Sequence, residues 1–233
     1  MMKSDSIIYL LSLAPKLNIN NLSSFEGFTI NDTSLLNEAL ISNNKEIILS
    51  LKEDYSSVFA FDNIDLDYIP ADFFNERMFG FFSDTLNQAN YIKSLFEKYS
   101  NRYANNLIIF SNAIGIKSTD ILQIFNLLAK DDENIVIGKA ANNRVTFLGF
   151  NSFNLELFEK INWNKLEYER LLQQVNQHEN FLHVMDNFFI IENLNDFRTL
   201  YIELSKKESL SYCGQSMHEK FTHLFIEYKE LLK

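Results

Sequence analysis

Two short segments decide the fold prediction: IIFSNAIG at residues 108–115 and GKAANNR at residues 138–144. Each begins at the end of an apolar run and continues into polar residues. The apolar runs, 107–110 and 134–138, have the length and composition of buried strands. The polar residues after them therefore indicate two loops, each at the end of a strand.

Strands and helices alternate along the rest of the chain. We predict further strands over 6–13, 57–61, 144–150, 181–185 and 188–191, and helices from 33 onward and over 74–99 (in one or two pieces), 118–130, 155–159, 165–177, 194–204 and 216–232. This pattern predicts an α/β fold with a mostly parallel central sheet and helices on both faces. Ligands bind at the carboxyl ends of the strands in such sheets. We therefore expect Asn112 and Asn142 to follow neighbouring parallel strands and to face one crevice, which Ser111 and Lys139 also border.

The two loops resemble, in order and without gaps, two motifs of a family of bacterial glycosyltransferase-like proteins. These are the nucleotide-diphospho-sugar transferases associated with radical-SAM and selenocysteine domains, which typically read Gly-Ser-Asp-Cys-Pro-Gly and Gly-Pro-Ala-(Asp/Glu)-Asp-Gly-Gly-Tyr there. NERM at 75–78, FEKINW at 158–163 and IIENLNDF at 190–197 are similar to further family segments. The resemblance covers roughly residues 74–200 and implies a GT-A, Rossmann-like fold.

The chain departs from that family where charged chemistry is expected. Asn112 stands at the position of the family's first acid, Asn142 at the second and Ile190 at the third. Asn143 and Arg144 replace its paired glycines. A metal-assisted transferase needs carboxylates near the diphosphate, because Mg²⁺ and Mn²⁺ prefer oxygen ligands. We therefore predict no metal site and no cofactor, the alternative being Mg²⁺ or Mn²⁺ bound with a nucleotide sugar.

Other charged residues offer two substitutes for the lost acids. Asp62, Asp65 and Asp67 follow a predicted strand, where they form either a relocated metal site or, as we favour, a solvated acidic loop. Lys139 and Arg144 flank the second loop and are a candidate metal-independent phosphate site. The run APKLN at 14–18 keeps only a trace of the family's phosphate-binding run. The predicted ligand-binding residues are Ser111, Asn112, Lys139, Asn142, Arg144 and Trp163.

Bulk properties limit the classes of partner. The 233 residues fit one domain, 1–233, and we predict that 201–233 forms a helical extension packed on it, the alternative being a homodimer contact through the last helix. A net charge of −10 argues against nucleic acid. The apolar run 7–14 is too short to span a bilayer. A single cysteine, Cys213, is typical of a buried thiol in a reducing compartment, so we predict a cytoplasmic protein.

These observations lead to a prediction of function in two forms. The favoured one is a divergent nucleotide-diphospho-sugar transferase-like protein without metal-dependent catalysis, acting as a ligand-binding or interaction module for a nucleotide, a nucleotide sugar or a protein partner. The alternative is an active glycosyltransferase or nucleotidyltransferase-like enzyme with a metal-independent or relocated site. The sequence identifies no catalytic residue, and the fold alone does not decide between them.

Overall fold

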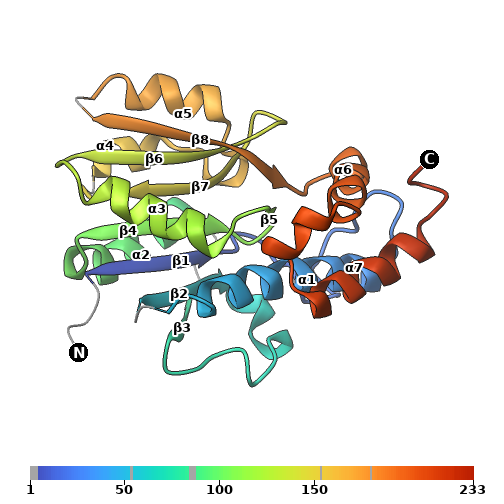
Figure 1. The fold of residues 1–233 in the computed structure, drawn as a ribbon. Coiled ribbons are helices and arrows are strands. Elements are labelled where there is room, and N and C mark those ends of the chain that lie inside the picture. Colours follow the sequence, from blue (N-terminus) through green and yellow to red (C-terminus); the bar gives the residue numbers. More distant parts are fainter. Residues whose placement is uncertain (1–4, 53–54, 84–87, 153, 179) are drawn as a thin grey trace.

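The computed structural model describes residues 5–52, 55–83, 88–152, 154–178 and 180–233. One sheet with strand order β3-β2-β1-β4-β7-β6-β8-β5 forms its centre (Figure 1). The strands are β1 (Ser6–Leu11), β2 (Ser56–Asp62), β3 (Met78–Ser83), β4 (Asn105–Phe110), β5 (Ala113–Ile114), β6 (Asn134–Ala140), β7 (Val145–Phe150) and β8 (Phe181–Ile190). The α-helices are α1 (Ile30–Leu49), α2 (Gln88–Tyr99), α3 (Ser118–Leu128), α4 (Leu155–Lys160), α5 (Tyr168–Val175), α6 (Leu194–Leu204) and α7 (Gln215–Glu227). Short 3₁₀ turns lie at 63–68, 100–102, 163–165 and 207–211.

The strand directions confirm the prediction of a mostly parallel α/β sheet. Strands β1, β2, β3 and β4 pair in parallel, and β6 pairs in parallel with β8. Strand β7 is antiparallel to both β4 and β6, and the short β5 is antiparallel to β8. Six strands therefore run in one direction, so that their carboxyl ends reach the same edge of the sheet.

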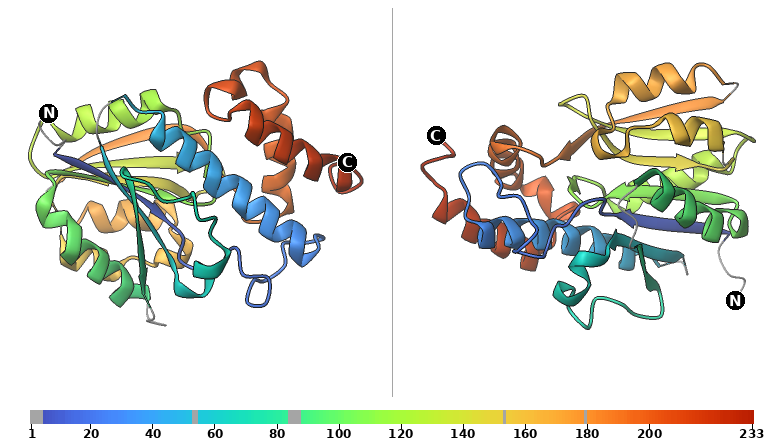
Figure 2. Two further views of the ribbon diagram at one scale, coloured as in Figure 1. Left: turned by 90° about the horizontal axis from the view of Figure 1, so that it is seen from below. Right: turned by 180° about the vertical axis from the view of Figure 1, so that it is seen from behind.

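Helices cover both faces of this sheet, as predicted (Figure 2). Helices α1 and α3 pack on one face, and α2, α4 and α5 pack on the other. On the second face the ring of Tyr9 in β1 meets Phe96 in α2 edge-on, with ring centroids 5.5 Å apart. Phe158 of α4 packs in the same way against Phe150 of β7, at 4.8 Å. Contacts between aromatic rings therefore join the helices of this face to the strands.

The prediction of a helix over 74–99 is wrong for its first part. Residues 78–83 form β3, an edge strand that pairs with β2 from Ser57 opposite Met78 to Asp62 opposite Ser83. The aromatic residues there recur at helical spacing, yet Phe79 and Phe82 are half exposed and aromatic residues also favour strands. Residues 84–87 lie outside the described residues. From 88 onward, helix α2 agrees with the prediction.

Two other predictions of local structure need correction. The two short strands expected at 181–185 and 188–191 are one strand, β8, whose register with β6 shifts between Gly138 and Ala140. The helix expected from residue 33 begins at Ile30, because the Thr29 side chain caps it by accepting the backbone N–H of Asp32. Both differences concern element ends and interruptions rather than the type of element.

The C-terminal helices pack on α1 beyond the edge of the sheet (Figure 1). Helix α7 lies beside α1, and Phe197, Phe221 and Leu224 form a second apolar cluster with Leu36 and Leu40 of α1. Cys213 belongs to this cluster as a buried free thiol, and burial raises its pKa to about 12. None of the described helices is long and apolar enough to cross a membrane.

Gly138 in β6 allows the closest packing inside the sheet. A Cβ atom at this position would overlap the ring of Phe147 in β7 and lie 2.5 Å from Thr146 Oγ1. We expect Gly138→Ala to lower the free energy of unfolding by about 2 kcal/mol, because buried neighbours leave no space for a methyl group. Urea denaturation measures this loss. Gly214→Ala is the control, since its Cβ would meet only the flexible Glu46 side chain. Gly214 is the N-cap of α7, so the control should lose no more than about 1 kcal/mol through weaker capping, and equal losses in both variants would contradict the packing argument.

Candidate functional site

The candidate site is a cavity at the carboxyl edge of the sheet. Strands β1, β4 and β8 end there and the antiparallel β7 begins there. The cavity has a volume of about 360 Å³. Its walls combine apolar side chains such as Leu11, Phe110 and Trp163 with the polar residues Ser111 and Asn112. The charged residues of its lining are Lys16, Arg144 and Glu192.

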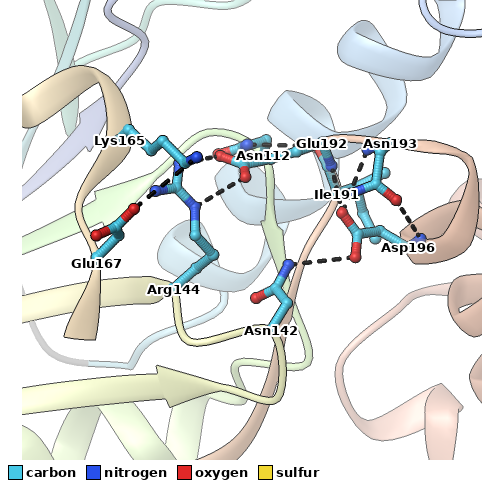
Figure 3. Close-up of polar contacts among 9 residues, drawn as sticks. All are labelled: Asn112, Asn142, Arg144, Lys165, Glu167, Ile191, Glu192, Asn193 and Asp196. Atoms are coloured by element: carbon cyan, nitrogen blue, oxygen red, sulfur yellow. Dashed lines mark hydrogen bonds and ion pairs between the residues drawn. The ribbon is translucent and has the colours of Figure 1, made fainter. Parts of the chain in front are cut away.

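Arg144 and Glu192 form an ion pair in the cavity wall (Figure 3). Arg144 is 6% exposed, its Nε donates to Glu192 Oε2 at 2.8 Å, and its Nη2 pairs with Oε1. This two-point contact fixes the plane of the guanidinium. The remaining nitrogen, Nη1, is buried and has no hydrogen-bond partner within the described part of the chain. A buried donor without a partner costs about 1–3 kcal/mol, which an acceptor atom within hydrogen-bond distance of Nη1 would remove.

The chain segment that carries Glu192 is held from two sides (Figure 3). Asn112 Nδ2 donates to the carbonyl oxygen of Ile191 at 3.3 Å. On the other side the Asp196 carboxylate accepts the backbone N–H groups of Glu192 and Asn193, at 3.0 and 3.2 Å. Burial raises the pKa of Asp196. These bonds place the Glu192 side chain opposite Arg144.

Asp65 fixes the loop that follows β1. Its carboxylate is 2% exposed and accepts the backbone N–H groups of Lys16, Leu17 and Asn18 at 2.7, 3.0 and 2.8 Å. The prediction of a solvated acidic loop is therefore wrong for Asp65. The alternative of a relocated metal site finds no support either, because no group of three His, Cys, Asp or Glu residues within the described part of the chain is arranged to hold a metal ion.

Lys16 contributes a cation to the cavity from this loop. Burial lowers the pKa of its ammonium group, and the charges of Glu192 and Asp65 oppose that shift. Among the described residues we find no hydrogen bond or ion pair to Lys16 Nζ, although its backbone N–H is bound by Asp65. Lys16 is therefore a desolvated cation without a direct counter-ion in the wall of the cavity.

The structure brings together four of the six predicted ligand-binding residues. Ser111, Asn112, Arg144 and Trp163 line the cavity. Ser111 is held from behind by Asn44 of α1, whose Nδ2 donates to the carbonyl oxygens of Ser111 and Ala113 at 3.3 and 2.8 Å. The Trp163 indole already donates to Phe158 at 3.0 Å, so it contributes an apolar wall.

Lys139 and Asn142 lie outside the lining of this cavity. Lys139 Nζ stands over the ring of Tyr168, 4.7 Å from its centroid. Asn142 Nδ2 donates to Asp196 at 3.2 Å (Figure 3). The expectation that Asn112 and Asn142 follow neighbouring strands is wrong, because β7 lies between β4 and β6. Both strands end at the same edge, but the intervening strand separates the two asparagines.

Two of the three charged residues of the cavity lining were not among the predicted site residues. Lys16 lies in the run 14–18, where the only signal was a faint similarity to a phosphate-binding run. Glu192 follows the predicted strand 188–191 and lies in the segment 190–197 that resembles a family motif, but it was not predicted to be a site residue. Its pairing with Arg144, 48 residues away, depends on the tertiary fold.

Comparison with known proteins places this geometry in a known fold. No protein-family model and no curated protein matches the sequence. Among solved structures, a proposed nucleotide-diphospho-sugar transferase from Desulfovibrio desulfuricans is similar with a TM-score of 0.72 and 16% identity, covering 98% of this chain and 97% of that chain. The Rv0371c protein of Mycobacterium tuberculosis, in complex with manganese, has a TM-score of 0.53 and 8% identity, covering 85% and 98%. A 4-diphosphocytidyl-2C-methyl-D-erythritol synthase from Anaerococcus prevotii has a TM-score of 0.50 and 12% identity, covering 95% and 96%.

These similarities establish the fold of the chain. It is the nucleotide-diphospho-sugar transferase fold, which the structure shares with cytidylyltransferases. The sequence identities are too low to carry over an activity.

Proposed function

We propose that the cavity binds a nucleotide or nucleotide sugar without a carboxylate-bound metal, and that the chain is a ligand-binding module of the nucleotide-diphospho-sugar transferase fold. The observation that carries this proposal is the arrangement of charges in the cavity. Two cations, Lys16 and Arg144, face a single carboxylate, Glu192, which is already engaged by Arg144. The cavity therefore favours an anionic ligand over a divalent cation.

The position of the cavity supports the same proposal. Ligands of open α/β sheets bind at the carboxyl ends of the strands, and this cavity lies at that edge. Asn112 stands where the resembled family has an acid, and its amide is bonded to the carbonyl oxygen of Ile191. The potential ligands of a divalent ion in this cavity are thus the Glu192 carboxylate, which is already paired with Arg144, and neutral amides. Membership of the radical-SAM and selenocysteine-associated family, a cytoplasmic location and a protein partner stay predictions.

An active transferase remains the second candidate, and it would have to stabilise the leaving phosphate through the same cations. Lys139 supports this less than the sequence suggested, because its ammonium group packs on Tyr168. Arg144 supports it more, because it lines the cavity and its Nη1 has no hydrogen-bond partner among the described residues. The two candidates share the binding site and differ only in whether the bound ligand reacts.

A thermal-shift screen tests the proposed binding. Nucleoside mono- and diphosphates and nucleotide sugars are added to the protein in EDTA and, separately, in Mn²⁺, since a similar fold has been solved with manganese. We expect at least one nucleotide to raise the melting temperature equally in both buffers, because binding to the folded state alone stabilises it. Stabilisation that requires Mn²⁺ would contradict the metal-independent site. No stabilisation by any nucleotide would contradict nucleotide binding altogether.

A further inference from the structure

We infer that Lys16 and Arg144 form a subsite for a single phosphate group, so that the cavity selects nucleotides with one phosphate over nucleoside diphosphates. This inference rests on the proposed function and adds which ligands the site accepts. It differs from the phosphate site expected at Lys139 and Arg144, because Lys139 lies on Tyr168 and outside the cavity lining.

The first support is the state of Arg144. Arg144 lines the cavity, and Glu192 binds its Nε and Nη2 and leaves Nη1 buried without a partner among the described residues. The carboxylate thus orients the guanidinium and neutralises most of its charge, while Nη1 stays available as a directed donor. A phosphate oxygen in the cavity would satisfy this donor and remove the cost of its burial.

The second support is the fixed position of Lys16. The three bonds from the Asp65 carboxylate to the N–H groups of residues 16–18 hold the loop in place and direct those N–H groups away from any ligand. Asp65 itself is not part of the cavity lining. The loop after β1 therefore contributes the ammonium group of Lys16 to the cavity, whereas the backbone N–H groups of residues 16–18 are not directed at a ligand. A compact, flexible ammonium group suits one phosphate oxygen as a point charge.

The net charge of the cavity lining determines how many phosphate groups of a ligand it can neutralise. Among the lining residues, Lys16 and Arg144 contribute two positive charges and Glu192 one negative charge, which leaves a net charge of one positive unit. One phosphate diester matches this charge, and one monoester, with a charge of about −1.5 to −2, exceeds it by no more than about one unit. A diphosphate brings a second charged group, which in other sites a metal ion or backbone amides neutralise. In this cavity the second phosphate would stay uncompensated in a partly desolvated position.

Calorimetric titration of the full chain in EDTA tests the inference. The probes are UMP, CMP, AMP and GMP, the corresponding diphosphates, and inorganic phosphate. We expect at least one monophosphate to bind and its diphosphate to bind no more tightly. Lys16→Met, which keeps the aliphatic stem, should weaken monophosphate binding tenfold or more, about 1.4 kcal/mol. Arg144→Lys, which keeps the positive charge opposite Glu192 but removes Nη1, should also weaken it.

Lys139→Met is the matched control and should leave the affinity unchanged, because its ammonium group lies outside the cavity lining. Circular dichroism measures whether each variant is folded. If Arg144→Lys does not fold, the affinity of Lys16→Met for the monophosphate alone tests the inference. Tighter binding of a diphosphate, or unchanged binding in Lys16→Met, would overturn the single-phosphate subsite while leaving nucleotide binding intact. Equal affinity for inorganic phosphate would overturn the assignment to nucleotides. Binding of none of the probes would overturn this inference, and the proposed function falls with it if no nucleotide sugar stabilises the protein in the thermal-shift screen either.

Discussion

Replacing Arg144 by methionine is expected to lower the free energy of unfolding by about 2–4 kcal/mol, because it leaves the Glu192 carboxylate without its partner in the cavity wall. The Glu192 side chain is 29% exposed, so water compensates part of the loss and places the effect toward the lower end of that range. Urea denaturation of the variant measures it. Calorimetry on the same variant should show weaker nucleotide binding, since both the charge and Nη1 are lost.

A double-mutant cycle separates the ion pair from simple packing. Adding Glu192→Met to Arg144→Met removes the unpaired carboxylate and should restore part of the lost stability. Arg170→Met is the matched control, because Arg170 also pairs with a glutamate, Glu167, but its side chain is 71% exposed. Exposed pairs contribute about 0–1 kcal/mol. A loss in Arg144→Met no larger than in Arg170→Met would contradict the role assigned to the buried pair.

Asp65→Ala is expected to cost about 3 kcal/mol of stability, because it leaves three backbone N–H groups of the loop after β1 without their acceptor. Hydrogen bonds to a charged group contribute about 1.5–3 kcal/mol each and are not additive, and water replaces part of them once the carboxylate is gone. Urea denaturation measures the loss. Nucleotide affinity should fall as well, since Lys16 is carried by the same loop.

Two further variants show whether the effect comes from the carboxylate. Asp65→Asn keeps one acceptor oxygen and should lose less stability than Asp65→Ala. Asp67→Ala removes an exposed acid of the same turn and should change stability by no more than about 0.5 kcal/mol. Similar losses in Asp65→Ala and Asp67→Ala would show that the buried carboxylate does not hold the loop.

The sequence was sufficient to predict the central strands of the sheet, because they are short and apolar and most of them are separated by helices. The predicted strand segments overlap five observed strands, namely β1, β2, β4, β6 and β7. The edge strand β3 could not be distinguished from a helix, because its aromatic residues recur at helical spacing and it is covered on one side only. Periodicity reports which residues are buried, and an exposed edge strand gives a weak signal.

Site residues were predictable only where they directly follow a predicted strand, because the end of the strand then fixes their place at the edge of the sheet. Ser111 and Asn112 line the cavity because they directly follow β4. The partners of Arg144 and of the loop amides were not predictable, because Glu192 and Asp65 are 48 and 47–49 residues away from the groups they bind. Lys139 precedes Arg144 by only five residues, but its ammonium group packs on Tyr168 and misses the cavity.

The most direct test of the central claim is a crystal structure of the chain grown in EDTA with the nucleotide that binds most tightly in the titrations. The proposed function predicts the nucleotide in the cavity between the ends of β1 and β4, with its phosphate within hydrogen-bond distance of Lys16 Nζ and Arg144 Nη1. A nucleotide bound elsewhere on the surface, or one that occupies the cavity only when Mn²⁺ is added, would contradict it.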